Sequence, residues 1–320
     1  MGVAAESGSI ASVTVAWNAS EVLLRHLGAL LGQSRPLDEV VLVDNASTDG
    51  TLAMLKQQFP WVTVLPMSAN LGVGGGFSAG LEYAFGRGHD WFWLFDQDSA
   101  PVPTALEELL KAYSGTLKHN RIGILAPLPV DPNSGVQHDV FLWRDRFVPV
   151  PAERARERVC FVDLVMSSGS LIRREIVQQA GLPRQDFFMD FVDYEYDLRI
   201  RRLGYRIALV PTSILWHRLG EPRAVKQWGG RVKVRGAQTA LRHYFMSRNE
   251  AFTIWYLHGS IRARLLLVPR MVRRAIGILW YDSPKFSKIK MLFWGLWDGL
   301  RKNLGTGLPK SGLPVQKKPV

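Results

Sequence analysis

The sequence predicts an α/β protein with a mostly parallel central sheet flanked by helices. Short apolar runs that are typical of strands alternate with amphipathic segments over the first 120 residues. Polar residues directly follow several of these runs, as at the ligand-binding edge of an open sheet. Basic aromatic segments replace the alternation after residue 217. We therefore divide the chain into an α/β domain, residues 1–217, and a C-terminal region, residues 218–320.

The elements of the alternating region follow from local pattern. Runs of β-branched and aromatic residues predict buried strands, and Gly- and Asn-rich stretches such as residues 45–50 predict turns. The expected order is strand 12–16, helix 21–31, strand 38–43, a helix ending at 59, strand 61–65, helix 77–86, strand 91–95 and helix 104–117.

The pattern is less regular after residue 120. Residues 130–160, rich in Pro and Arg, predict an irregular excursion. Residues 218–320 predict a basic helical appendage, because their apolar stretches carry arginines at helical spacing. The other expected elements are strands over 121–127, 162–173 and 206–210 and a polar helix over 192–203.

Charge is unevenly distributed along the chain. The net charge is +12, but 21 Lys and Arg accompany only 4 Asp and Glu from Arg218 onward, so that part carries +17 and the rest carries −5. A basic region rich in Trp, Phe and Leu suits an anionic membrane surface or a pyrophosphate-bearing lipid. A packed helical unit with a solvated basic face is the alternative. No nucleic-acid partner is expected, because no recognised binding motif accompanies the charge.

Compartment signals are few and agree with one another. Cys160 is the only cysteine, which excludes an internal disulfide and fits a reducing environment. The first residues lack the basic region of a secretory signal, and no apolar run reaches the roughly 18 residues of a membrane span. We expect a cytoplasmic protein, peripheral at the inner face of the cell membrane.

The most specific polar signal follows the predicted strand 91–95. There, Asp96 and Asp98 flank Gln97. Two carboxylates in a strand-to-loop bend can point into one crevice and supply hard oxygen ligands for Mg²⁺ or Mn²⁺. Such pairs are also common in surface loops, and the position after a buried strand favours the metal site. The other polar signals at predicted strand ends are Trp17, Asn18 and Asp44.

A glycine-rich segment, residues 70–80, precedes a predicted helix. Its Asn70 and five glycines would let a ligand approach the backbone, and free N–H groups at the helix start attract anions. A purely structural turn is one alternative. Another is a dinucleotide-binding loop, because residues 74–79 match G-x-G-x-x-A and Asp96 follows at a strand end. Against it, several residues separate the preceding strand from the glycines, and Asp98 has no role there.

Three segments stand out together: VDNASTDGT at 43–51, NLGVGGG at 70–76 and LFDQDS at 94–99. In this combination they resemble glycosyltransferase family two, the inverting enzymes of the GT-A fold, and especially its rhamnosyltransferase branch, and the likeness covers roughly residues 12–250. The resemblance implies a GT-A nucleotide-sugar-binding fold. It also implies that Asp44 contacts the nucleoside and that the metal, Mg²⁺ or Mn²⁺, lies at Asp98. The nucleotide-sugar contacts so implied are Ala16, Trp17, Asn18, Asp44, Asn70, Gly72, Gly75 and Asp96.

An acidic block at residues 189–199 is the place to seek a general base. Inverting transfer needs a carboxylate that takes the proton of the acceptor hydroxyl while its oxygen attacks the anomeric carbon. A solvated acidic helix end is the alternative. By resemblance, Asp193 is the base and Asp190 the fallback, while Glu195 orients the acceptor or the loop. Arg199 is expected to pair with these acids.

His217 follows the predicted strand 206–210 after a short interval. Histidine is a common metal ligand, although a lone loop histidine is usually structural. In related GT-A enzymes a late histidine joins the acidic motif on the cation, so the resemblance makes His217 the second ligand beside Asp98.

The expected function is inverting transfer of a hexose in cell-surface polysaccharide synthesis. The donor is expected to be dTDP-rhamnose, and the acceptor a saccharide or a polyprenyl-diphosphate-linked saccharide. Transfer of galactofuranose or another hexose by the same residues is one alternative. The alternatives outside this class are an NAD-dependent oxidoreductase and a catalytically silent carbohydrate-binding scaffold at the membrane.

Overall fold

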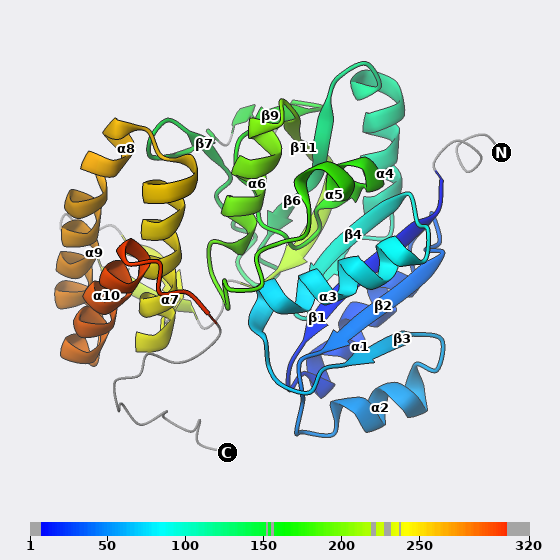
Figure 1. Cartoon of the computed structure of the whole chain (residues 1–320). Coiled ribbons are helices and arrows are strands. Elements are labelled where there is room, and N and C mark those ends of the chain that lie inside the picture. The colour runs from blue at the N-terminus through cyan, green and yellow to red at the C-terminus, as the bar shows by residue number, and fades with distance from the viewer. Residues whose placement is uncertain are drawn as a thin grey trace.

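The structure, a computed structural model, describes residues 8–151, 153–154, 157–218, 222–226, 232–236 and 238–305. A nine-stranded sheet has the order β3-β2-β1-β4-β10-β6-β11-β5, with β9 paired to β11. Helices cover both of its faces (Figure 1), which confirms the predicted α/β class. Its strands are β1 (Ile10–Ala16), β2 (Glu39–Asp44), β3 (Thr63–Pro66), β4 (Trp91–Asp96), β5 (Ser99–Pro101), β6 (Ile122–Val130), β9 (Cys160–Val162), β10 (Leu171–Arg173) and β11 (Arg206–His217).

Two apolar cores hold the layers together. One lies between the sheet and α3, α5 and α6, and the other between the sheet and α1, α2 and α4. The central strands β1 and β4 are buried along almost their whole length, as their continuous apolar sequence predicts. The helices are α1 (Ser20–Leu31), α2 (Thr51–Gln58), α3 (Gly72–Gly86), α4 (Ala105–Ala112) with the π-helical turn η1 (Tyr113–Leu117), α5 (Arg174–Ala180) and α6 (Val192–Arg202).

The neighbouring strands in the run β3-β2-β1-β4 are parallel, and β6 is parallel to β11. Strands β5, β9 and β10 are antiparallel to their neighbours. The single strand predicted over 162–173 is wrong. Residues 160–173 form two short strands in different places in the sheet, because β9 pairs with β11 and β10 enters between β4 and β6. The excursion at 130–160 contains a small hairpin of β7 (Phe141–Trp143) and β8 (Phe147–Pro149).

The C-terminal region, predicted to be helical over residues 218–320, begins instead with a hairpin of β12 (Pro222–Lys226) and β13 (Val232–Gly236). The part that follows the hairpin is helical, as predicted. In the described residues it consists of α7 (Ala240–Phe252), the π-helical turn η3 (Thr253–His258), α8 (Ile261–Leu265), α9 (Leu267–Tyr281) and α10 (Lys285–Leu300). Helix α7 lies nearest the α/β layers, and α8, α9 and α10 lie beyond it (Figure 1). No helix in the described ranges combines the length and hydropathy needed to span a bilayer.

Candidate active site at the carboxyl edge of the sheet

Three predicted site segments meet at one edge of the sheet. Strand β1 pairs in parallel with β2 on one side and β4 on the other, with Ala16 opposite Asp44 and Val15 opposite Asp96. The carboxyl ends of the three strands therefore lie together, as the parallel topology predicts. Asp44 and Asp96 flank the end of β1 from its two sides.

Asp44 is fully buried and only partly satisfied. Its Oδ2 accepts a hydrogen bond from the backbone N–H of Ser47 at 3.1 Å, whereas its Oδ1 has no partner among the described residues. The Oδ1 of the adjacent Asn45 is also unpartnered, although its amide donates to Gly72 O at 3.0 Å. Buried polar atoms are normally paired. Two orphaned acceptors on consecutive residues are therefore suited to a ligand that donates hydrogen bonds.

The loop after β1 is fixed by its neighbours. Trp17 donates its backbone N–H to Oε1 of Gln97 at 2.7 Å, and Asn18 accepts at Oδ1 from Thr48 N–H at 2.8 Å. Asn18 also has a positive φ of 48°, a conformation that costs free energy in a non-glycine residue. The middle residue of the acidic motif, Gln97, thus ties the β4 loop to the β1 loop, a role that its sequence position alone did not indicate.

The glycine-rich segment lies inside a helix rather than in a loop. Helix α3 begins at Gly72, five residues earlier than predicted, after Asn70 accepts Gly72 N–H at 2.8 Å. A Cβ on Gly74 would lie 2.3 Å from the carbonyl oxygens of Arg184 and Phe187. Glycine is needed there for close packing of protein against protein. The dinucleotide-binding alternative is wrong, because these glycines form no phosphate loop after a strand.

Gly72 and Gly75 lie in the first turn of α3 with different surroundings. A Cβ on Gly72 would meet the carbonyl oxygen of Phe188, and one on Gly75 would meet the side chain of Leu71. Both were predicted as nucleotide-sugar contacts, and that role stays a prediction. What the structure adds is that this turn supports the loop preceding α6.

Asp98 and His217 come together although 118 residues separate them in sequence. The strand predicted to stop at Val210 continues as β11 to His217, with a bulge after Val210, and it places His217 opposite Ser99 of β5. Nδ1 of His217 lies 3.6 Å from Oδ1 of Asp98 and 2.7 Å from the hydroxyl of Ser99. That hydroxyl is 2.6 Å from the hydroxyl of Ser168.

The donor set at Asp98 and His217 fits a divalent cation that is completed by a ligand. A carboxylate oxygen and an imidazole are acceptable to Mg²⁺ or Mn²⁺, which usually keep several non-protein ligands. The described residues contain no group of three or more His, Cys, Asp or Glu that could hold a metal alone. Diphosphate oxygens and water would therefore supply the remaining positions.

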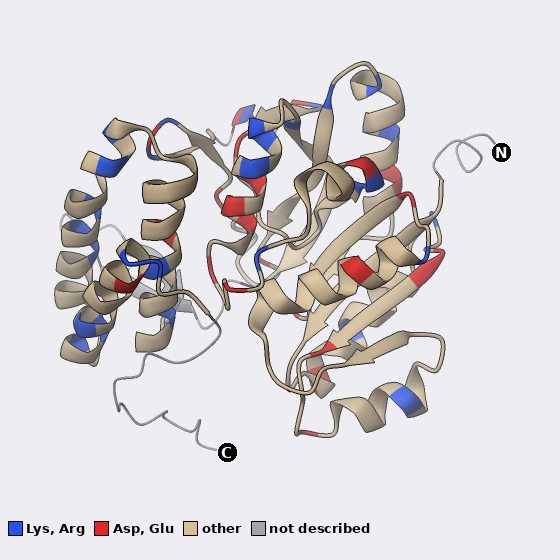
Figure 2. Ribbon diagram, viewed as in Figure 1, with Lys and Arg blue, Asp and Glu red and all other residues tan. Residues whose placement is uncertain are grey.

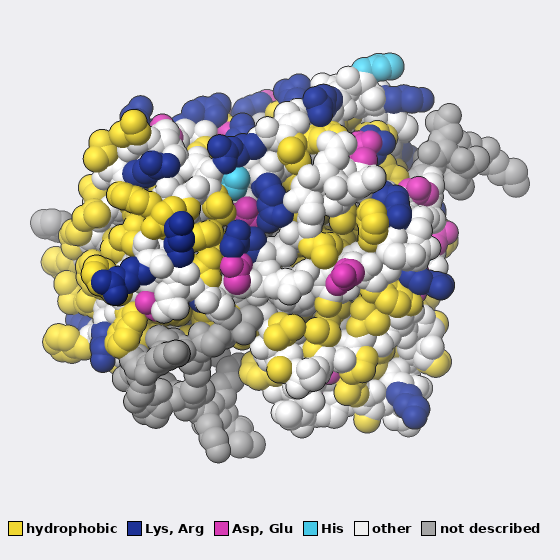
Figure 3. Space-filling model, viewed as in Figure 1, with side chains coloured by type: hydrophobic (Ala, Val, Ile, Leu, Met, Phe, Trp, Pro, Cys, Tyr) yellow, Lys and Arg dark blue, Asp and Glu magenta, His cyan; other side chains and the backbone are white. Residues whose placement is uncertain are grey.

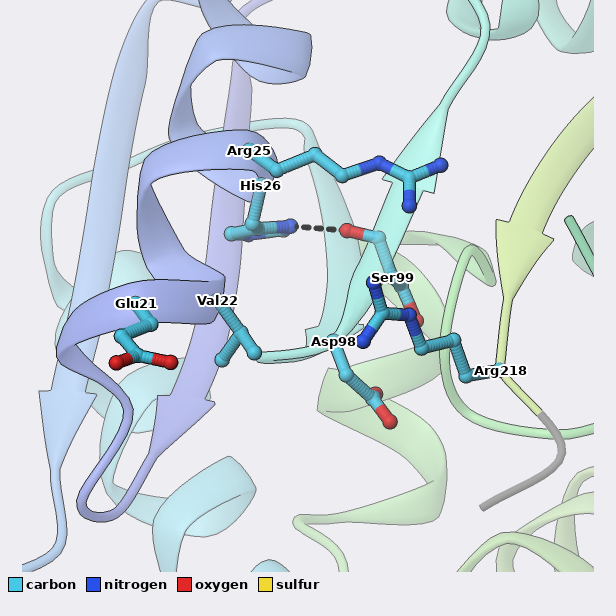
Figure 4. A pocket seen from close by; sticks show the side chains of 7 residues that line it. All are labelled: Glu21, Val22, Arg25, His26, Asp98, Ser99 and Arg218. Carbon is cyan, nitrogen blue, oxygen red and sulfur yellow. Dashed lines mark hydrogen bonds between the residues drawn. The ribbon is translucent and has the colours of Figure 1, made fainter. Parts of the chain in front are cut away.

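A pocket of about 250 Å³ lies beside Asp98 on the α1 side of the site. The guanidinium groups of Arg25, from α1, and Arg218, after β11, approach it from different sides (Figure 4). They are positive charges next to the acidic motif, and neither was singled out from the sequence. The pocket is lined by Glu21, Val22, Arg25, His26, Asp98, Ser99 and Arg218.

Asp193 lies in the first turn of α6, with acids as neighbours. Burial raises the pKa of its carboxyl to about 7, backbone N–H groups oppose the shift, and the charges of Asp190 and Asp96 add to it. Burial and the charge of Asp98 likewise raise the pKa of Asp96 to about 7. The fold therefore brings the predicted base near the acidic motif, with a pKa suited to proton transfer at neutral pH.

Glu195 and Arg199 are engaged with each other. The buried carboxylate of Glu195 accepts hydrogen bonds from the Arg199 guanidinium and lies 3.3 Å from Nε2 of His258. Burial opposes ionisation, but these hydrogen bonds outweigh it and lower the pKa of Glu195. Arg199 also donates to the carbonyls of Ala180 and Leu182. The pair is suited to fixing α6 in place.

Helix α7 clamps the turn that precedes Asp193. Asp190 and Phe191 are consecutive non-glycine residues with positive φ, 58° and 65°, so this turn is strained. Arg242 forms hydrogen bonds of 3.0 and 3.1 Å with the Asp190 carboxylate, and Asn249 donates to the carbonyls of Met189 and Asp190, each at 2.9 Å. Sequence reasoning missed Arg242 and Asn249, because no local motif connects them to the acidic block.

Comparisons with known proteins agree with the α/β fold. The model of the family described as "Glycosyl transferase family 2" matches residues 12–180. The dTDP-rhamnosyl transferase RfbF of Shigella flexneri is 22% identical over 94% of this chain and 98% of its own length. The galactofuranosyltransferase GlfT1 of Mycolicibacterium smegmatis is 24% identical over 77% of this chain and 82% of its own.

A further relative is an N-acetylglucosaminyl-diphospho-decaprenol L-rhamnosyltransferase of Mycobacterium tuberculosis, 29% identical over 64% of this chain and 74% of its own. Among solved structures, GalNAc-T7 with UDP, GalNAc and Mn²⁺ has a TM-score of 0.55, at 16% identity over 82% of this chain and 55% of that one. S. aureus TarS 1–349 in complex with UDP has a TM-score of 0.51, at 15% identity over 89% and 69%. At these identities the two structures support the fold alone.

Proposed function

Because the chain belongs to glycosyl transferase family 2 and is a hexosyltransferase that uses a nucleotide-sugar donor, we propose that it is an inverting rhamnosyltransferase with Asp193 as general base. The single observation that carries the proposal is the meeting of Asp44, Asp96, Asp98 and Asp193 at one edge of the sheet, with the pKa of Asp193 raised to about 7.

In this proposal the donor lies across the carboxyl ends of β2, β1 and β4. The orphaned Oδ1 atoms of Asp44 and Asn45 accept hydrogen bonds from the nucleoside, and the backbone of residues 16–18 lines the base. Asp96 faces the ribose or diphosphate. The predicted contacts at Asn70, Gly72 and Gly75 belong to the same surface, at the start of α3.

Asp98 and His217 are the proposed metal ligands. A cation held there would offset the negative charge that develops on the departing nucleoside diphosphate. Arg25 and Arg218 lie beside Asp98, and their positive charges would also offset the negative charge of the departing diphosphate. Ser99 orients the His217 imidazole through its 2.7 Å contact with Nδ1.

Asp193 would remove the proton from the acceptor hydroxyl as its oxygen attacks the anomeric carbon. Bond formation to this oxygen and departure of the diphosphate occur in one displacement, so the anomeric configuration inverts. Asp190, held by Arg242, keeps the turn before Asp193 in place, and Glu195 with Arg199 does the same for the first turns of α6.

The sugar and the acceptor are assigned from relatives. Two of them are named as rhamnosyltransferases, one acting on a decaprenol-linked diphospho-sugar, which supports rhamnose as the donor sugar and a lipid-linked saccharide as the acceptor. We also propose that the chain works at the inner face of the membrane, with residues 218–320 as the peripheral part, because a lipid-linked acceptor is confined to a membrane. Galactofuranose is the second candidate, because GlfT1 resembles the chain over a comparable span.

The decisive experiment is a transfer assay with a panel of nucleotide sugars and a synthetic polyprenyl-diphospho-saccharide, with Mn²⁺, with Mg²⁺ and with chelator. The proposal expects turnover with dTDP-rhamnose, lost on chelation and restored by adding the metal. Turnover with UDP-galactofuranose alone would assign the second candidate. Full turnover in chelated enzyme would remove the metal from the proposal. Thermal-shift measurements with each donor test binding independently of chemistry.

A further inference from the structure

Large apolar side chains are exposed over α8, α9 and α10. Four are at least 73% exposed: Ile261, Leu265, Trp280 and Phe286. Figure 3 shows hydrophobic side chains gathered over this side of the molecule with Lys and Arg among them. An exposed apolar surface of this kind marks an interaction site. We call it the α8–α10 face; its exposed apolar members are Ile261, Leu265, Val268, Val272, Ile276, Leu279, Trp280, Tyr281, Phe286, Phe293 and Trp297.

Helix α9 is apolar on two neighbouring sides, about 100° apart around the helix axis. Its inward side chains, Leu267, Met271, Ala275 and Ile278, are buried against α7 and α10. A second stripe at positions 268, 272, 276 and 279, with the same helical spacing, points outward and is exposed. Packing among the described residues accounts for the first stripe only. The second stripe, unlike the polar outer face of an ordinary surface helix, is unexplained by the described fold.

Basic residues accompany the exposed stripe, and acids are scarce. Residues 261–302 contain ten Lys and Arg and only two acids, Asp282 and Asp298. Asp298 is buried and accepts a hydrogen bond from Tyr244, while Asp282 lies 3.3 Å from Lys288. Lys and Arg mark α8 to α10 in Figure 2, whereas acids mark the start of α6. The exposed part of this region is therefore apolar and positively charged.

Two of the arginines serve the fold. Arg270 and Arg274 pair with the fully buried Glu250 of α7, at 2.8 and 2.9 Å. Arg262, Arg273 and Lys285 are exposed on the outside of the same helices, beside the apolar stripe. Their chains can lie along an apolar surface while the charged ends meet anionic head groups.

We propose that the α8–α10 face docks on an anionic lipid bilayer, with its apolar stripe in the interface and its basic residues at the head groups. Both attractions act together in interfacial binding of an amphipathic helix. A second copy of the chain fits less well, because a symmetric contact would bring like charges together. The inference deepens the proposed function, since a lipid-linked acceptor is confined to that surface.

The docking face is rigidly connected to the active site. Gly295 and Gly299 of α10 lie so close to α7 that a Cβ would come within 2.1 and 2.3 Å of the carbonyl oxygens of Tyr244 and Arg248. Arg248 donates in turn to the carbonyl of Asp186 at 2.8 Å. A protein held at α10 is therefore held at the loop that precedes the proposed base.

The test measures binding of the full chain to vesicles of phosphatidylcholine alone or with phosphatidylglycerol. We expect co-sedimentation with the anionic vesicles, weakened by salt, and at least tenfold weaker partitioning for Trp280→Ser/Phe286→Ser. Leu265→Ser is matched by Leu31→Ser on α1, since these leucines are 73% and 69% exposed. Only Leu265→Ser should weaken binding. Arg273→Glu/Lys285→Glu should weaken it about tenfold on anionic vesicles.

Other outcomes would overturn the docking proposal. The first is equal vesicle binding by Leu265→Ser and Leu31→Ser. The second is binding of the native chain to neutral vesicles at a strength that the charge reversals do not change. The third is dimerisation of the native chain that is abolished by Trp280→Ser/Phe286→Ser. Donor binding in solution is measured in parallel by thermal shift. Loss of vesicle binding with intact donor binding reports on the docking face, whereas absence of donor binding in the native chain contradicts the proposed reaction instead.

Discussion

The carboxyl edge of the sheet and the α8–α10 face depart from ordinary protein chemistry in opposite ways. At the sheet edge, Asp44 is buried with an orphaned oxygen, and the partly buried Asp193 nearby has a raised pKa. On the α8–α10 face, apolar side chains are exposed among basic ones. Each arrangement costs the free protein stability that a ligand or surface would restore. Helix α7 contacts both regions, and substitutions can test whether they act separately.

The largest effect is expected from Asp193→Asn, because the amide cannot take up the proton of the acceptor hydroxyl. We expect kcat to fall about 10²–10⁴-fold with donor affinity and vesicle binding unchanged. Steady-state transfer kinetics measure kcat, and thermal shift measures donor affinity. The control is Glu175→Gln, which also replaces a carboxylate by an amide, here in the ion pair between Glu175 of α5 and Arg173. Undiminished kcat in Asp193→Asn would assign the proton to another group, with Asp190 the next to test.

Substitution at the proposed metal site should come next. His217→Ala removes one ligand, and we expect about 100-fold lower activity at limiting Mn²⁺, partly recovered at high metal concentration. Asp98→Asn should behave alike. The exposed His119 provides the control His119→Ala. An unchanged metal requirement in both site variants would show that the cation binds elsewhere.

A smaller effect is expected at Arg242, which joins helix α7 to the turn before Asp193. Arg242→Gln leaves Asp190 without its cation and frees the strained turn, so we expect about tenfold lower kcat with little change in donor KM. Arg242→Lys should recover part of the loss, because it restores the charge but not the two-pronged hydrogen bond. A defect confined to vesicle binding would instead assign Arg242 to the docking face.

The pH dependence should be the mildest effect. Since burial raises the pKa of Asp193 to about 7, and the base must be ionised, activity should rise as the pH increases through about 7. The sign for stability is opposite. A folded-state pKa above the ordinary 3.8 gives stability that is full below about pH 4 and lost as the pH rises through about 7.

Urea unfolding of native chain and Asp193→Asn at pH 5 and pH 8 checks that sign. The variant should gain stability relative to the native chain at the higher pH, because its side chain carries no charge in this partly buried position. A relative gain at the lower pH would mean that the carboxyl is already ionised in the folded state.

The sequence determined the fold class and the positions of Asp44 and Asp96 at the ends of neighbouring strands, because those signals are local. A continuous apolar run ending in Asp96, and another ending in Asp44, specify strands and the residues at their ends without reference to the rest of the chain. Parallel pairing then requires those ends to meet. The resemblance to family two, confirmed by the family match over residues 12–180, depends on the same short segments.

Only the tertiary structure decided what the glycines and the C-terminal part do. Glycine is required at position 74 because the backbone of Arg184 and Phe187 packs against it, and these residues lie more than a hundred positions away in the sequence. No local pattern therefore shows whether a glycine faces a ligand or another segment of the chain. Arg242 and Asn249 reach the acidic block by packing of α7. Likewise, sequence periodicity shows that α9 is apolar, but burial of one stripe by α7 and α10 decides which stripe remains exposed.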